Sequence, residues 1–377
     1  MKFDTHLCLV SSQATPNLAP ALDPNFQPRR VVLAVSPEMQ ERADWLAAVF
    51  KERGASVELL EISDPYDYNH CWDCFTDWIA EQPGNVALNV TGGTKIMAMA
   101  AQDVFREEKK PVFYVNVEND QVIRLDVRGT PFTLPTRIKL SQYLKAHGYA
   151  VLKKPVKPDI TKNTRDFVER LAYDSERLGK ALGTLNWLSQ QAKNTLTSPP
   201  LEGRDIKSEA LDELIGRFSH EGKLDLVDNK LVFPDENARQ FVNGGWLEYL
   251  IYQSLVQLAP ELGIGDYAIG MEVLAPDGKT RNELDAACLQ RNTLHIIECK
   301  SANLSLTGKT GEASGTDALY KLDALRRMGG SRTKAMLVDF RGSLHDVDKR
   351  RAAQMNLRVV AGSQLRDLRG ALKAWLK

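Results

Sequence analysis

Two neighbouring segments decide how this chain folds: residues 281–288 (RNELDAAC) and residues 294–300 (LHIIECK). Both have the composition of strands, and a short polar turn joins them. Because side chains alternate along a strand, Glu298 and Lys300 share one face, and Asp285 can point from the neighbouring strand to the same spot. Such a cluster is costly to bury unless it binds a metal or is otherwise paired.

The chemistry of this cluster points to phosphodiester hydrolysis. Two carboxylates can hold a divalent cation, and a lysine beside them can orient or deprotonate a water, or stabilise the charge of a phosphate. An acid followed by an acid-x-lysine strand resembles the PD-(D/E)xK restriction-endonuclease-like superfamily, although the proline of the nominal motif is missing. The alternative is a surface hairpin with a fortuitous ion pair. The apolar run at residues 294–297 favours a core strand.

Length and composition set the frame for the rest of the chain. With 377 residues we expect two or three domains. Lysine plus arginine and aspartate plus glutamate both number 49, so a nucleic-acid substrate must be met by a local patch. Five cysteines do not suggest a disulfide framework, and the C-x-x-C pair of Cys71 and Cys74 has no second metal-binding pair nearby. The sequence lacks a signal peptide or membrane-spanning run, which predicts a cytoplasmic protein.

Strands alternate with helices along the first part of the chain. The pattern begins with an apolar strand at residues 6–11 and ends with an added hairpin at residues 122–134. Alternation of this kind predicts a parallel sheet with helices on both faces. The other strands are expected at residues 31–35, 57–62, 86–90 and 112–117, and the helices at residues 36–53, 71–80 and 94–108.

Two polar loops follow strands of this sheet, at residues 11–17 (SSQATPN) and residues 91–95 (TGGTK). Ligands of such sheets bind beyond the carboxyl ends of the strands. Gly92 and Gly93 let backbone approach a ligand, the helix N-terminus that follows favours anions, and Lys95 adds a cation. The combination predicts a phosphate-bearing ligand, although the spacing is not that of a Walker loop. The alternative is a tight turn that needs its glycines only for geometry.

The Thr-Gly-Gly-Thr-Lys loop, placed after the fourth strand of a Rossmann-like domain, resembles that of a CARF domain, the cyclic-oligoadenylate sensor of type III CRISPR systems. A CARF domain followed by a PD-(D/E)xK domain resembles the ancillary CRISPR nucleases of antiviral defence. The resemblance implies a homodimer that binds cyclic tetra-adenylate across its two-fold axis and is activated allosterically. The ligand-binding residues that it implies are Ser11, Ser12, Gln13, Thr15, Asn17, Thr91, Gly92, Gly93, Thr94 and Lys95.

The middle of the chain is expected to connect these two domains. A basic, proline-spaced connector spans residues 136–160, and helical periodicity follows at residues 163–197 and 211–215. A short hairpin then turns at Asp228 and Asn229. Helices followed by a hairpin suggest a winged-helix-like module, which can bind DNA or act as a spacer. The predicted fold class is α/β, with a Rossmann-like CARF domain (1–150), a linker and helical or winged-helix-like module (151–240), and a restriction-endonuclease-like α/β domain (241–377).

The last domain offers further candidates around the strand cluster. An amphipathic helix begins at Trp246, and the resemblance places Glu248 in the active site; the alternative is an ordinary boundary glutamate. Residues 301–316 form a long polar loop in which we expect a mobile gate. The helix expected at residues 317–328 carries Lys321, Arg326 and Arg327. These three are candidate phosphate contacts, and the alternative is a solvated basic face.

These features predict a metal-dependent endonuclease. Asp285, Glu298 and the main-chain carbonyl of Cys299 would hold Mg2+ or Mn2+. Glu248 would support the metal or its water, and Lys300 would position the attacking water. The expected substrate is DNA and/or RNA, with cleavage of single strands or nicking of one strand. Two alternatives stay open: a ligand-responsive DNA-binding regulator with an inactive nuclease fold, and a ring nuclease that degrades its own activator.

Overall fold

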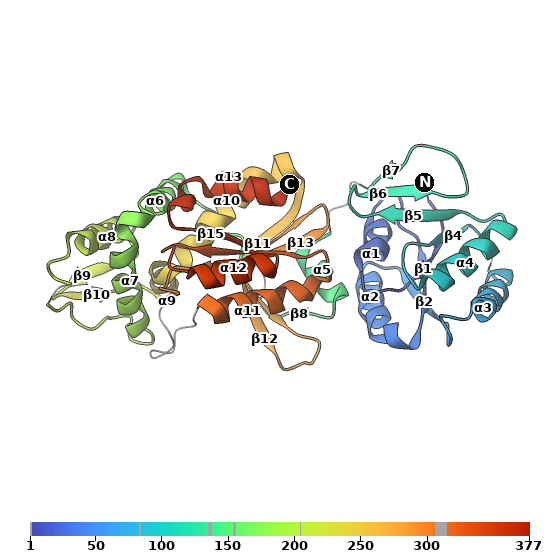
Figure 1. The fold of residues 1–377 in the computed structure, drawn as a ribbon, viewed down its shortest axis with the longest axis horizontal. Coiled ribbons are helices and arrows are strands. Elements are labelled where there is room, and N and C mark those ends of the chain that lie inside the picture. Colours follow the sequence, from blue (N-terminus) through green and yellow to red (C-terminus); the bar gives the residue numbers. More distant parts are fainter. Residues whose placement is uncertain (1, 83, 135–137, 154–155, 204, 306–314) are drawn as a thin grey trace.

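The computed structural model describes residues 2–82, 84–134, 138–153, 156–203, 205–305 and 315–377. Figure 1 shows three parts in a row, with a blue-to-teal sheet domain at one end and a green helical module at the other. A second sheet domain, yellow to red, lies between them. Among the described residues no helix is both long and apolar enough to cross a bilayer.

The N-terminal domain is built on a sheet of seven strands in the order β3-β2-β1-β4-β5-β6-β7. The first five strands are parallel and the last two antiparallel, as the sequence predicts. Apolar residues of α1 and α2 pack on one face of the sheet, and those of α3 and α4 on the other. The bounds are β1 Thr5–Leu9, α1 Thr15–Leu22, β2 Arg30–Val35, α2 Gln40–Glu52, β3 Ser56–Glu61, α3 Tyr68–Ala80, β4 Val86–Asn89, α4 Lys95–Glu107, β5 Val112–Asn116, β6 Gln121–Arg124 and β7 Phe132–Thr133.

Helix α1 was not expected, because the polar loop was predicted to continue to residue 17. The helix begins at Thr15, with Pro16 in the first turn, where proline has no hydrogen bond to lose. Leu18 and Leu22 are one turn apart, and both are buried. Their burial on the sheet outweighs the weak helix propensity of a segment with a second proline inside it. The predicted loop is therefore only residues 10–14.

A short helix, α5 (Leu140–Ala146), joins the first sheet domain to the second. It packs against α2, and the backbone N–H of Leu140 donates to Asp266 Oδ2 in the second domain (2.9 Å). The strand that follows, β8 (Ala150–Val151), pairs with β11 of the second sheet. The predicted connector at residues 136–160 thus contains ordered elements, although its residues 136–137 and 154–155 lie outside the described part.

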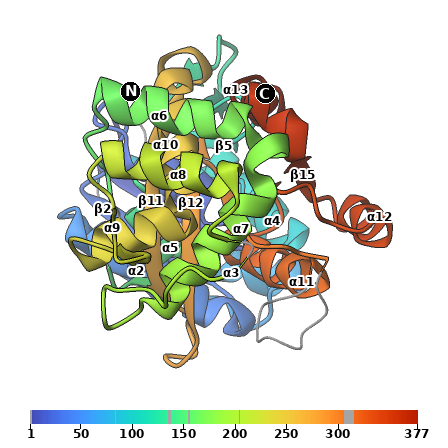
Figure 2. The same cartoon turned by 90° about the vertical axis from the view of Figure 1, so that its left-hand side faces the viewer.

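The middle module consists of three helices and a hairpin, which agrees with the winged-helix-like prediction. Figure 2 views the molecule from this end, with α6, α7 and α8 in front of the second sheet. The single helical run expected at residues 163–197 is two helices that meet at Asp174. Asp228 and Asn229 have positive φ values of 49° and 57°, as a tight hairpin turn requires. The bounds are α6 Lys162–Tyr173, α7 Ser175–Gln191, α8 Glu209–His220, β9 Asp225–Val227 and β10 Lys230–Val232.

The C-terminal domain has a six-stranded sheet in the order β15-β14-β13-β12-β11-β8. Helix α10 covers one face and α11 the other. The predicted strand pair is confirmed, whereas β11 and α12 had not been expected. Of the predicted gate, residues 306–314 lie outside the described part. The bounds are α9 Glu236–Gln240, η2 Phe241–Gly245, α10 Trp246–Leu262, β11 Ile264–Leu274, β12 Arg281–Gln290, β13 Thr293–Lys300, α11 Gly315–Arg326, η3 Arg327–Gly329, β14 Lys334–Asp339, α12 Asp346–Gln354, β15 Arg358–Ala361, η4 Gly362–Asp367 and α13 Leu368–Leu376.

Candidate active site and ligand loops

The strand cluster forms where β12 and β13 separate. Their antiparallel pairing ends at Ala286 and Ile297. Beyond that point the backbone N–H of Cys299 has no strand partner on β12. It donates instead to Oδ2 of the Asp285 side chain (2.7 Å). Burial and the neighbouring Glu298 nevertheless raise the pKa of Asp285 to about 6. Asp285 is therefore held next to Glu298 by both the strand register and a backbone hydrogen bond.

Glu298 is the most deeply buried acid of the cluster, with 0% of its surface exposed. It follows Leu294 and Ile296 on the face that α11 covers. Its Oε1 accepts from Lys300 Nζ at 2.6 Å and from Lys321 Nζ at 2.8 Å. Its Oε2 is buried without a partner among the described residues. A buried carboxylate oxygen with no donor is unfavourable unless a cation meets it.

Lys300 is held in its charged form. Burial opposes the charge, but attraction to Glu298 and Asp285 outweighs this, so the pKa of Lys300 is raised. A lysine that keeps its proton can orient a water or stabilise phosphate charge, whereas it cannot act as a base. Of the roles considered from the sequence, the electrostatics favour the orienting one.

Glu248 reaches the cluster from the first turn of α10, and this agrees with the placement implied by the resemblance. Burial, with repulsion from Asp285 and Glu283, raises its pKa to about 8. Glu283 lies two residues before Asp285 on β12 and is exposed. It was missed from the sequence, although the period-two alternation of a strand places it on the same side as Asp285.

The backbone at Cys299 faces the same side as the carboxylates. Lys300 O accepts from Phe340 N toward β14 (2.8 Å), so by strand alternation the N–H and carbonyl of Cys299 face β12. The donor set of this corner is therefore two carboxylates and a carbonyl, which suits a hard divalent cation. No group of three or more His, Cys, Asp or Glu side chains in the described residues forms a metal cluster. Any metal here would need water or substrate oxygens to complete its coordination.

Helix α7 of the middle module lies across the carboxyl ends of the parallel strands. Ser175 Oγ donates to Gly362 O beyond β15 (3.1 Å), and Asn186 Nδ2 donates to Ser301 Oγ beyond β13 (2.9 Å). Between these contacts, Gly183 leaves space for the guanidinium of Arg341, which follows β14. The middle module therefore forms one wall of the site, a role that the sequence did not indicate.

The two predicted ligand loops lie side by side. β1 pairs with both β2 and β4, so the chain order of the sheet changes direction between β1 and β4. This is the position at which α/β sheets bind ligands. Ser12 and Lys95 are exposed there, and Ser11 and Gln13 are half-buried. A Cβ on Gly92 would lie 2.0 Å from Leu9 O, so the fold itself requires this glycine.

Several other predicted ligand residues are engaged within the fold. Asn17 is fully buried, donates to Leu9 O and accepts from Asn89 Nδ2, both at 2.9 Å. Thr91 Oγ1 accepts from Val115 N (2.8 Å), and Thr94 caps α4 by accepting from the backbone N–H of Met97. Thr15 is buried as well. Of the predicted ligand residues, Ser11, Ser12, Gln13, Lys95 and the backbone around Gly93 are therefore the ones left accessible, while the others hold the loops in shape.

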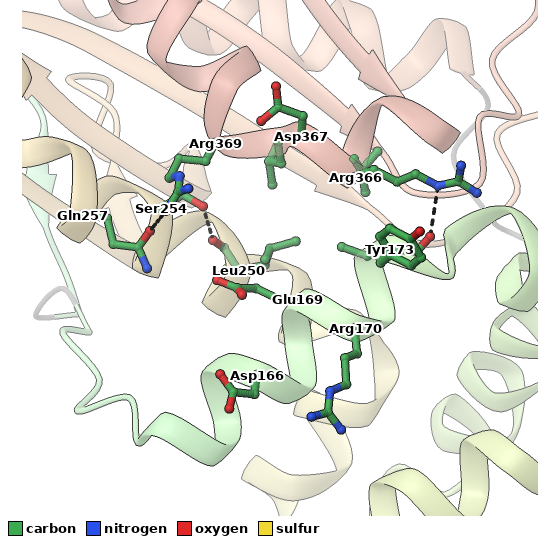
Figure 3. Close-up of a pocket in the computed structure, with 13 residues that line it drawn as sticks. Asp166, Glu169, Arg170, Tyr173, Leu250, Ser254, Gln257, Arg366, Asp367 and Arg369 are labelled. Atoms are coloured by element: carbon green, nitrogen blue, oxygen red, sulfur yellow. Dashed lines mark hydrogen bonds between the residues drawn. The ribbon is translucent and has the colours of Figure 1, made fainter.

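A separate cavity of about 520 Å3 lies among α6, α10 and the η4–α13 segment (Figure 3). Its charges are mixed, since Asp166 and Glu169 line it together with Arg170 and Arg369. Arg369 is engaged with Gln257 (2.7 Å). None of the predicted site residues lines this cavity. The strand cluster and the loops of the first sheet remain the candidate sites.

The fold and the site define a class of protein: a Rossmann-like ligand-sensing domain joined to a restriction-endonuclease-like domain. Comparison with protein-family models agrees, since residues 5–143 match the Card1 CARF domain and residues 235–377 the Card1-like endonuclease domain. The chain therefore belongs to the proteins that combine a Card1 CARF domain with a Card1-like endonuclease domain. No curated protein matches the sequence.

Solved structures share this architecture. Protein VC1899 from Vibrio cholerae is 26% identical with a TM-score of 0.88, and the match covers 99% of this chain and 97% of that one. Can2 from Sulfobacillus thermosulfidooxidans, solved with cyclic tetra-adenylate, is 28% identical with a TM-score of 0.80 and full coverage of both chains (100% and 100%). A type III CRISPR defence DNA nuclease activated by cyclic oligoadenylate, 21% identical with a TM-score of 0.55 over 90% of this chain and 45% of that one, shares the fold.

Proposed function

We propose that this protein is a metal-dependent nuclease that cyclic oligoadenylate, and cyclic tetra-adenylate in particular, switches on in type III CRISPR defence. The observation that carries the nuclease part is the corner where Asp285, Glu298 and Lys300 meet, with Glu298 Oε2 buried and without a partner among the described residues. The full-length likeness to Can2, solved with cyclic tetra-adenylate, supports the choice of ligand.

Each residue of the strand cluster has its own role in phosphodiester hydrolysis. Asp285, Glu298 and the carbonyl of Cys299 would hold Mg2+ or Mn2+, with Glu248 supporting the metal or its water. When bound, the cation supplies charge stabilisation to the phosphorane-like transition state. Lys300 keeps its proton and orients the attacking water. Lys321 contacts the same oxygen of Glu298 as Lys300 does.

The sensor part places the anion between the two loops of the first sheet. Lys95 supplies a cation, and the N-terminus of α4 supplies free N–H groups and the positive end of the helix dipole. A ring of adenylates carries several phosphates and a two-fold arrangement, which suits a homodimer that presents two such loop pairs. The buried Asn17 and Thr91 act indirectly, because they fix the loops.

A binding measurement tests this assignment. Calorimetric titration with cyclic tetra-adenylate, cyclic hexa-adenylate and linear tetra-adenylate should give tightest binding for the first. Lys95→Ala should weaken it at least about tenfold through loss of a phosphate contact. Lys51→Ala, an exposed helix lysine of the same domain, serves as the control. Equal binding by Lys95→Ala and wild type would remove this loop from the ligand site.

A further inference from the structure

One continuous segment reaches from the active-site acid to the ligand loop of the sensor domain. It consists of α11, η3 and the turn at residues 330–333. At its active-site end, Lys321 Nζ lies 2.8 Å from Glu298 Oε1, the oxygen that Lys300 also contacts. The Lys321 side chain is 44% exposed and that of Lys300 is 24% exposed, so Lys321 is the freer of the two.

The other end of the segment contacts the sensor side through two hydrogen bonds. Tyr143 of α5, only 2% exposed, donates its Oη to Gly329 O at 2.8 Å. Gln13 Nε2, in the loop after β1, donates to Ser331 Oγ at 3.1 Å. The hydroxyl of Thr15 also faces the phenol of Tyr143. Gln13 of the predicted ligand loop thus contacts this segment directly, and Thr15 reaches it through Tyr143.

Packing along the segment leaves little room for independent movement of its ends. Leu319, Leu322 and Leu325 of α11 are buried against the sheet. At Gly329, a Cβ would lie 2.3 Å from Thr333 Oγ1 and 3.1 Å from the Tyr143 ring. Close-packed elements shift as units rather than deform continuously. A displacement of the loop after β1 would therefore shift the position of Lys321.

The charges at Glu298 give such a displacement a chemical consequence. The ammonium groups of Lys300 and Lys321 neutralise the charge of the Glu298 carboxylate. They therefore compete with a divalent cation for this buried side chain. Lys300 comes from the strand that carries Glu298 and keeps its place. Lys321 comes from the helix, so a small shift of α11 can remove it. The ion pair between Lys321 and Glu298 is therefore suited to being a reversible block.

We propose that Lys321 is an inhibitory counter-ion of Glu298, and that α11 with η3 transmits ligand occupancy from Gln13 and Tyr143 to this ion pair. Lys321 is a positioning residue in this scheme. Ligand binding favours the arrangement in which Lys321 leaves Glu298 and the cation enters, which requires the ligand to bind that arrangement more tightly. The inference rests on the proposed function, since it takes the loop after β1 as the ligand site and Glu298 as a metal ligand.

Lys321→Met tests the counter-ion, because methionine keeps the length of the side chain without its charge. Calorimetry without cyclic tetra-adenylate should show Mn2+ bound about tenfold more tightly than by wild type. Cleavage without the ligand should rise, and the ratio of rates with and without ligand should fall. Lys349→Met on α12, whose partner Asp346 is exposed, is the control. If Lys321→Met binds Mn2+ as wild type does and cleaves more slowly with and without ligand, Lys321 is a phosphate contact and the proposal fails.

Ser331→Ala tests the link to the sensor, since it removes the partner of Gln13 on an exposed turn. Calorimetric affinity for cyclic tetra-adenylate should stay near that of wild type, while the stimulation ratio falls about fivefold. Ser141→Ala, on the exposed side of α5, is the matched control. An unchanged ratio in Ser331→Ala, beside clear stimulation of wild type, overturns the relay alone. Absence of stimulation in wild type overturns the proposed function and the relay with it, whereas the Mn2+ titration of Lys321→Met still decides the counter-ion.

Discussion

Asp285 Oδ2 accepts a hydrogen bond from the backbone N–H of Cys299 at 2.7 Å, one residue beyond the end of the β12–β13 ladder. The contact does two things at once. It satisfies a strand N–H that would otherwise face a gap, and it fixes a carboxylate beside Glu298. Asp285 therefore has a structural role at the end of the strand pair as well as a role in the candidate site. Different substitutions at Asp285 should separate the effect on stability from the effect on activity.

Asp285→Asn and Asp285→Ala separate those two effects. Asparagine can still accept from Cys299 N through its amide oxygen, and it removes a charge that burial and Glu298 disfavour. The melting temperature should therefore equal or exceed that of wild type while cleavage is lost. Alanine leaves the N–H unpaired, which costs about 1–3 kcal/mol. Thermal unfolding and a cleavage assay on both variants check this. Equal stability of the two variants would show that the hydrogen bond contributes nothing.

Glu298→Gln should lower cleavage by at least about a hundredfold, because the neutral amide no longer supplies the negative charge that attracts a cation and Lys300. Binding of cyclic tetra-adenylate should be retained, since Glu298 lies on the second sheet and contacts no residue of the ligand loops. Circular dichroism and calorimetry confirm folding and binding beside the rate measurement. Substantial activity of this variant would contradict the assignment of the active site.

Glu248→Gln should stabilise the protein in the absence of metal. Burial and repulsion from Asp285 and Glu283 raise the pKa of Glu248, so its charge is unfavourable in the folded protein. Removing it should raise stability by about 1 kcal/mol, or a few degrees of melting temperature, while cleavage falls. Glu261→Gln, on the exposed end of α10, loses its partner Lys373 and should not stabilise. A lower melting temperature for Glu248→Gln would refute the electrostatic argument.

Three buried histidines predict acid sensitivity. Burial lowers the pKa of His6 to about 3 and those of His147 and His295 to about 4, from an ordinary value of 6.5. Above pH 6.5 the three histidines are neutral in both the folded and the unfolded chain, so they do not lower the free energy of unfolding. As the pH falls from 6.5 toward 4, the unfolded chain binds protons that the folded protein excludes, and each histidine costs about 1 kcal/mol per pH unit.

His6→Leu tests that account, because His6 lies among Phe3, Phe26 and Phe113 with both ring nitrogens unpaired in the described residues. Urea unfolding between pH 4.5 and 7 should show a shallower loss of stability than in wild type. His220→Leu, at the exposed end of α8, serves as the control. An unaltered pH dependence in His6→Leu would mean that this histidine takes up its proton in the folded protein too.

The sequence predicted local features well where one signal dominated. The strands that carry Asp285 and Glu298, the hairpin at Asp228 and the helix that carries Glu248 follow from alternation, turn residues and helical periodicity. Helix α1 was missed because Pro20 lies inside it, and its burial on the sheet depends on partners far away in the chain. The same limit applies to β11, whose place between β12 and β8 is a property of the sheet.

The clustering of the candidate acids was predictable from the sequence, whereas the surroundings of the candidate site were not. Acid-x-lysine spacing identifies Glu298 and Lys300, because both lie on one strand. The approach of Asn186 to Ser301 depends on how the middle module lies across the strand ends, and no local pattern encodes that. Thr15 and Asn17 were grouped with the ligand loop because the resemblance implied them, whereas they are buried, with Asn17 hydrogen-bonded inside the fold.

The most direct test of the account is cleavage of labelled single-stranded RNA, single-stranded DNA and supercoiled plasmid with Mn2+, with and without cyclic tetra-adenylate. Wild type and Glu298→Gln should be measured in parallel. The account predicts that wild type cuts at least one substrate only when the ligand is present, and that Glu298→Gln cuts none. Equal rates with and without ligand would contradict the activation, and tight ligand binding without any cutting would favour a regulator with an inactive nuclease fold.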